Sequence, residues 1–114
     1  MDSTISTIKV IQPSGILNGP QANQLRHDIH ESLEAGARGV LVDLQNVTFI
    51  DSSGLGGLVL AFKSARGTGR KVFFCSVGEQ ARMLFEITGM DQVFQIYPDQ
   101  REFDRVLQET PELI

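Results

Sequence analysis

The stretch from residue 47 to residue 60 constrains this chain most, because its pattern changes from strand to helix in the middle. Residues 47–50 are β-branched or apolar and favour a strand. Asp51, Ser52 and Ser53 follow, and their short side chains suit the unpaired amides of a helix N-terminus. One apolar helix face comes next, formed by Leu55, Leu58, Val59 and Phe62. The pattern predicts a strand that leads directly into a helix.

The junction suggests, as one hypothesis, a switch that works by phosphorylation. A hydroxyl there would lie at the positive end of the helix dipole, where a phosphate is well accommodated. Gly54, Gly56 and Gly57 remove side-chain bulk, so we expect the backbone of a partner to approach closely. Taken alone, residues 51–53 are more often a plain helix cap than a phosphorylation site, and their composition does not choose between Ser52 and Ser53.

Length and composition indicate one domain over residues 1–114, with a core over about 4–108. A net charge of −4 gives no electrostatic footprint for nucleic acid. The single cysteine, Cys75, excludes an internal disulfide and fits a reducing cytosol. No signal peptide is visible, and no apolar run reaches the roughly 20 residues of a membrane span. We expect a cytoplasmic protein without a membrane or nucleic-acid partner.

The order of predicted elements indicates an α/β fold. An alternating strand over residues 4–12, which includes Ile5, and a short strand at 16–17 predict an opening β-hairpin. Asn18 is a candidate cap for a helix that ends before Gly36. Strands and helices then alternate, which predicts a mixed, largely parallel sheet of about four to five strands covered by about four helices. The predicted later elements are strands at 39–44, 71–76 and 93–97, helices from 52 to about 65, at 79–88 and at 99–109, and a frayed tail at 110–114.

The spacing of residues argues against several kinds of catalytic or ligand-binding site. The glycines after Ser53 lack the third glycine of a dinucleotide loop, which Val59 replaces, and the G-x-S-x-G pattern of hydrolases is absent. His27 and His30 lie far upstream without metal-ligand company, so we expect a solvated surface there. Cys75 follows two phenylalanines and is expected in the core. The interpretation is a protein that is not an enzyme, with no catalytic residue, metal or cofactor.

The element order, together with residues 49–56, resembles the STAS domain of bacterial anti-sigma factor antagonists. In that family a strand ends in Asp-Ser-Ser-Gly or Asp-Ser-Thr-Gly at the start of the second main helix, as at residues 51–54 here. Residues 15–18 are similar to the family's Gly-x-Leu-Asp loop, and residues 42–47 to its hydrophobic-Asp-Leu-x-x-Val strand. Residues 85–91 resemble the late helix end, and Val93 with Phe94 the strand after it.

The resemblance implies signal transduction by partner switching that regulates transcription. The unphosphorylated antagonist would bind an anti-sigma factor that is also a serine kinase of the histidine-kinase-like ATPase fold. That kinase would phosphorylate Ser53, or Ser52 as the second choice, and a metal-dependent serine phosphatase would reverse the modification. The expected partner-binding residues are Asn18, Asp51, Ser52, Ser53, Gly54, Leu55 and Gly56.

Some alternatives stay open. Asn18 stands where many antagonists have Asp or Thr, which puts the identity of the kinase in doubt more than the mechanism. A stand-alone STAS scaffold or a nucleotide-sensing regulator of another pathway is the second hypothesis. The basic group of Lys63, Arg66, Arg70 and Lys71 is either a solvated helix end or a contact for an acidic partner. The expected oligomeric state is a monomer, or a weak dimer formed through an edge strand.

Overall fold

The structure is a computed structural model that describes residues 8–114, so the predicted strand residues 4–7, Ile5 among them, lie outside the described part. The first strands are β1 (Ile8–Ile11) and β2 (Ser14–Leu17), followed by helix α1 (Gly19–Glu34). The middle of the chain contains β3 (Gly39–Asp43), β4 (Asn46–Ile50), helix α2 (Ser52–Gly67) and β5 (Lys71–Cys75). The last elements are α3 (Glu79–Thr88), the 3₁₀ turn η2 (Met90–Gln92), β6 (Gln95–Tyr97), α4 (Gln100–Glu109) and the 3₁₀ turn η3 (Pro111–Leu113).

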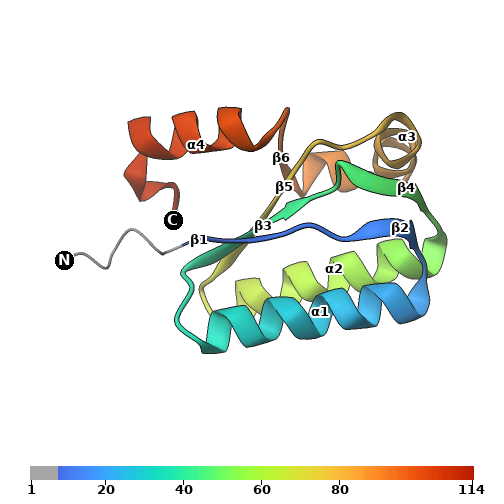
Figure 1. Ribbon diagram of the computed structural model, residues 1–114, viewed down its shortest axis with the longest axis horizontal. Coiled ribbons are helices and arrows are strands. Elements are labelled where there is room, and N and C mark those ends of the chain that lie inside the picture. The colour runs from blue at the N-terminus through green and yellow to red at the C-terminus, as the bar shows by residue number, and fades with distance from the viewer. Residues whose placement is uncertain (1–7) are drawn as a thin grey trace.

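The α/β fold class is confirmed, with a four-stranded sheet in the order β1-β3-β5-β6 and a two-stranded sheet of β2 and β4. Every strand pair within residues 8–114 is parallel. The expected opening hairpin is corrected, because β1 pairs with β3 whereas β2 pairs with β4. The chain bends at Gln12 and Pro13 without reversing, and β2 continues in the direction of β1 (Figure 1). Strand β4 continues β3 in the same way.

Helices cover the two faces of the main sheet unequally. Helices α1 and α2 lie side by side on one face, and α4 lies on the opposite face (Figure 1). The larger core, which includes Val40, Val42, Val72 and Phe74, also contains buried residues of α3. The smaller core joins Leu41, Phe73 and Cys75 to Phe103 of α4. Successive residues of β3 and β5 therefore face two different cores, which explains the continuous apolar runs Val40–Val42 and Val72–Cys75 within these strands.

The last residues differ from the frayed tail that the sequence predicts. Pro111–Leu113 form a 3₁₀ turn, and Leu113 and Ile114 pack against the smaller core. The Lys71 ammonium donates to the Leu113 carbonyl at 2.7 Å, which joins the turn to the start of β5. Apolar burial and this bond hold the segment against the sheet.

Candidate functional site

The N-terminus of α2 is held by its own cap and by the end of β2. The Asp51 carboxylate accepts a hydrogen bond from the Gly54 amide at 2.7 Å, as an N-cap does. The Asp51 amide donates to the Leu17 carbonyl at 3.2 Å. The predicted passage from strand to helix is confirmed, since β4 ends at Ile50 and α2 begins at Ser52.

The register of β2 and β4 places two helix starts next to each other. Leu17 pairs with Ile50, so the caps that follow, Asn18 and Asp51, occupy neighbouring positions. The predicted cap at Asn18 is confirmed, because its side-chain oxygen accepts from the Gln21 amide at 3.1 Å. Both α1 and α2 therefore present the positive ends of their dipoles at the same end of the molecule.

We expected a partner to approach the backbone at three glycines. At two of them another segment of this chain already lies close. A Cβ at Gly54 would lie 1.9 Å from the Leu17 carbonyl oxygen, and a Cβ at Gly57 would lie 2.3 Å from the Ala22 Cβ. Gly54 is buried beside Leu17, and its expected contact with a partner stays a prediction. Gly56 is exposed, with no atom within 4 Å of its hypothetical Cβ, and it alone fits the original expectation.

Leu55 also belongs to the core more than to the surface. Its side chain is 8% exposed and packs in the larger core beneath the first turn of α2. Leu55 therefore anchors the helix start on the sheet, and its expected role as a partner contact stays a prediction.

Ser52 and Ser53 are both exposed on the first turn of α2. The first backbone amides of a helix have no partner within the helix. The Asp51 side chain takes the Gly54 amide, so the amides of Ser52 and Ser53 stay available to an anion. Exposure alone does not choose between the two serines. Ser53 lies closer to α1, since its Cβ would be 3.6 Å from a Cβ at Gly19.

A shallow hollow of about 640 Å³ surrounds these serines. Residues from the starts of α1 and α2 and from the end of α3 line it, among them Gly19, Asn23, Gly56, Thr88 and Met90. No sequence pattern connects Thr88 and Met90 with this site, because only tertiary packing brings the end of α3 and the start of η2 to α2.

Gln80 supports the site from α3, and no sequence pattern indicates this role. Its amide nitrogen donates to the Ile50 carbonyl, and its oxygen accepts from the Ile50 amide, both at 2.9 Å. The side chain thus pairs with β4 as a neighbouring strand would, immediately before Asp51. No local pattern identifies such a contact, because Gln80 lies 30 residues from Ile50.

Asp43, the 1% exposed carboxylate at the end of β3, connects three segments. It accepts from the Gln12 side chain at 3.0 Å, the Gln100 side chain at 2.7 Å and the Gln45 amide at 2.9 Å. Burial alone would raise the pKa of Asp43, but hydrogen bonds led by that of Gln100 bring this pKa below its ordinary value. The carboxylate therefore stays ionised. It joins the bend between β1 and β2 and the bend between β3 and β4 to the start of α4.

The two histidines lie at the surface and Cys75 lies in the core, as the sequence predicts. His27 and His30 are exposed and lie 3.5 and 3.3 Å from Glu31 and Glu34 on the same helix. Cys75 is fully buried, and burial raises the pKa of its thiol to about 11. No cluster of potential metal ligands occurs in residues 8–114, and no helix there is long and apolar enough to span a membrane.

This chain is similar to known proteins in both sequence and fold. The family model described as the STAS domain matches residues 2–103. A protein named as a candidate anti-sigma factor antagonist, BtrV of Bordetella bronchiseptica, is 29% identical over 72% of this chain and 71% of its own. The anti-sigma-B factor antagonist of Staphylococcus aureus is 33% identical over 54% of this chain and 56% of its own, so the chain spans little more than half of that relative.

Solved structures show the same fold. A candidate anti-sigma factor antagonist of Thermotoga maritima is 25% identical with a TM-score of 0.77, covering 90% of this chain and 88% of that one. The antagonist SpoIIAA in its unphosphorylated form is 20% identical with a TM-score of 0.67, covering 93% of both chains. SpoIIAA in a phosphorylated form, described as a Bacillus cell fate determinant, also has a TM-score of 0.67.

Proposed function

Because the chain belongs to the STAS domain family, we propose that it is an anti-sigma factor antagonist that works by partner switching. In this proposal the unphosphorylated form binds a serine kinase of the histidine-kinase-like ATPase fold in the cytoplasm. Phosphorylation of Ser53 releases the kinase, and a metal-dependent serine phosphatase restores binding. The chain itself catalyses no reaction.

The observation that carries the proposal is the pair of exposed serines on a helix start with free backbone amides. A phosphate on Ser53 adds a charge of about −1.5 to −2. The amides of α2, with the start of α1 beside them, offset that charge within the domain, so the fold persists. The position of Ser53 beside Gly19 supports the choice of this serine over Ser52.

The same phosphate weakens binding across an interface, since it adds bulk and a charge that needs new solvation. Repulsion between like charges at an interface costs several kcal/mol. At about 1.4 kcal/mol for each tenfold change, this lowers affinity by about a hundredfold or more. Release therefore needs no unfolding of the antagonist.

The experiment begins with intact mass and peptide mapping of the protein from its native cells. We expect a fraction that is heavier by one phosphate, with the modification on Ser53. The Ser53→Ala variant then serves as bait for the kinase, and Ser53→Asp should bind the purified kinase about a hundredfold more weakly. Ser52→Asp is the matched control, which we expect to bind more tightly than Ser53→Asp.

The outcomes separate this proposal from the scaffold and nucleotide-sensor hypotheses. Phosphate on Ser52 would keep partner switching and move the site by one residue. If every growth state leaves the protein without phosphate, and the partner ignores both aspartate variants, the switch is wrong. A rise in melting temperature with added GTP or ATP would then favour a nucleotide sensor, since a ligand of the native state alone stabilises it.

A further inference from the structure

A groove between α1 and α2 is larger than the hollow at Ser53 and is separate from the chemistry proposed there. It encloses about 840 Å³ and runs between the outer faces of the two helices. Asn23 and Leu60 line both the groove and the hollow, so the two are continuous. Ser53 itself lines only the hollow, so the groove offers a second surface beside it.

Helix packing explains why a groove forms here. Near their starts the helices approach closely, because Gly57 lies against Ala22. Beyond this contact, the longer side chains of Leu33 and Leu60 line the groove. Arg70 lies at the far end, where its guanidinium donates to the Leu33 carbonyl at 2.9 Å and also to the Ala37 carbonyl.

The floor of the groove is apolar and partly open to solvent. Ile29, Ala61 and Ala65 are buried there. Leu60 is 52% exposed and adds open apolar surface beside them. An apolar side chain of a partner would remove this surface from water.

The rim is basic although the chain as a whole is acidic. Arg26, Lys63 and Arg70 line the groove, and Glu34 is the only carboxylate among its lining residues. Glu34 lies 3.3 Å from His30, which also lines the groove. Because the net charge of the chain is −4, this concentration of cations contrasts with the rest of the molecule.

We propose that the α1–α2 groove binds an acidic amphipathic helix of a partner protein. Recognition of this kind places the apolar face of a helix on an apolar floor, at a spacing of three to four residues. Carboxylates on the flanks of that helix would meet Arg26 and Lys63, which gives electrostatic complementarity. A membrane fits less well, since the floor is concave and an acidic chain is repelled by anionic lipid.

The test uses the whole ¹⁵N-labelled chain and two synthetic peptides of about 18 residues, long enough for a helix. Both carry leucines at positions i, i+3, i+4 and i+7, with glutamate on the flanks of one and lysine on the flanks of the other. We expect the glutamate peptide alone to shift the amide signals of residues around the groove, Arg26, His30, Leu60 and Lys63 among them. The shifts should saturate and should weaken as salt is raised.

Charge reversal supplies the matched controls. The double variant Arg26→Glu and Lys63→Glu should bind the glutamate peptide at least about tenfold more weakly, because two attractive contacts become repulsive. The double variant Arg82→Glu and Arg101→Glu changes the net charge equally on exposed residues outside the groove and should bind as the wild type does. Circular dichroism of both variants verifies that they fold.

The results either support the groove or overturn it. Equal binding of both peptides, absence of binding, or shifts confined to another surface would overturn the proposal. Binding to phosphatidylglycerol vesicles that depends on Arg26 and Lys63, in place of peptide binding, would assign the groove to a membrane and also overturn it. Ser53→Asp should leave peptide binding unchanged, so this test can succeed or fail independently of the phosphorylation switch.

Discussion

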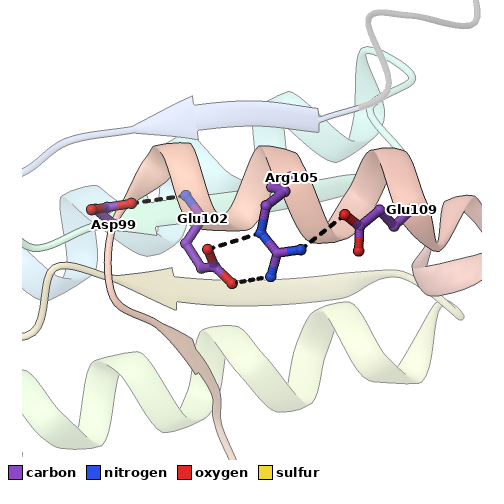
Figure 2. A network of polar contacts seen from close by, with 4 residues as sticks. All are labelled: Asp99, Glu102, Arg105 and Glu109. Carbon is purple, nitrogen blue, oxygen red and sulfur yellow. Dashed lines mark hydrogen bonds and ion pairs between the residues drawn. The ribbon is translucent and has the colours of Figure 1, made fainter.

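The N-termini of α2 and α4 use the same local cap and differ in what surrounds it. Asp51 caps α2 through the Gly54 amide at 2.7 Å, and Asp99 caps α4 through the Glu102 amide at 2.8 Å. The first turn of α4 contains the carboxylate of Glu102, whereas that of α2 contains no acidic residue. Figure 2 shows that Arg105 joins Glu102 to Glu109, so these three charges are paired within the helix.

The comparison shows that a cap by itself does not define a switch. A negative group near a helix N-terminus is favourable, and α4 already contains one of its own. On α2 the corresponding surface has two exposed hydroxyls and a second helix start beside them. A phosphate would therefore gain most from the helix dipole on α2, where Asp51 caps the helix but the first turn contains no acidic residue.

The largest effect is expected from Gly54→Ala, which would break the close approach of α2 to β2. The new Cβ would overlap the Leu17 carbonyl, so the helix start must shift. We expect a loss of about 3 kcal/mol or more in the free energy of unfolding, at the upper end for overpacking. Gly56→Ala is the control, because its Cβ meets open space and the change should stabilise the helix by up to about 1 kcal/mol.

Urea denaturation of both glycine variants measures this difference. Equal stability of the two variants would mean that Gly54 is not needed for the contact between α2 and Leu17. A stable Gly54→Ala protein that still binds the partner would also remove the structural reason for a glycine after the two serines.

The second largest effect is expected from Asp43→Asn, which weakens the contact of α4 with the sheet. Asp43→Asn replaces an acceptor with a donor that faces Gln12 and Gln100, so we expect a loss of about 1–3 kcal/mol at pH 7. The pKa of Asp43 lies below its unfolded value, so its contribution is complete above the ordinary pKa of about 3.9. That contribution is lost as the pH falls through the folded pKa.

Urea denaturation at pH 7 and in steps below pH 4 tests the sign of this effect. The difference in stability between wild type and Asp43→Asn should narrow as the medium becomes more acidic. A difference that is constant with pH would show that the ionised carboxylate is not what holds the two strand bends to α4.

The two caps themselves give a direct comparison. Asp51→Ala and Asp99→Ala should each lower the free energy of unfolding by about 1 kcal/mol, the usual value of an N-cap. Only Asp51→Ala should also change phosphorylation and kinase binding, because the serines lie on α2. Asp51→Asn, which keeps a capping oxygen, should restore stability; equal effects of the two alanine variants on kinase binding would contradict the distinction.

The smallest effect is expected from Arg105→Ala, which removes both ion pairs of α4. These groups are exposed, and exposed pairs contribute little because water and salt screen them. Thermal denaturation should show a change smaller than that of Asp99→Ala. A larger change would mean that the pairing in Figure 2, more than the cap, holds the start of α4.

Local patterns were sufficient for much of the fold. The periodic apolar residues of α1 and α2 predicted both helices, and the apolar runs predicted β3 and β5. The opening hairpin was wrong, because a turn-like Pro13-Ser14-Gly15 segment does not tell whether the next strand reverses. Here each strand finds a parallel partner elsewhere, and that choice depends on long-range pairing.

Some features of the candidate site were likewise predictable from local sequence, and others were not. The caps at Asn18 and Asp51 and the exposure of Ser53 were predictable, since capping involves residues only three apart. The closeness of Gly54 to Leu17, the contact of Gln80 with Ile50 and the groove between α1 and α2 were not. Sequence alone determined where helices begin, because hydrogen bonds between near neighbours decide it. Only tertiary structure decided which backbone fills the space beside a glycine and which surfaces stay open, because packing between segments far apart in the chain sets both.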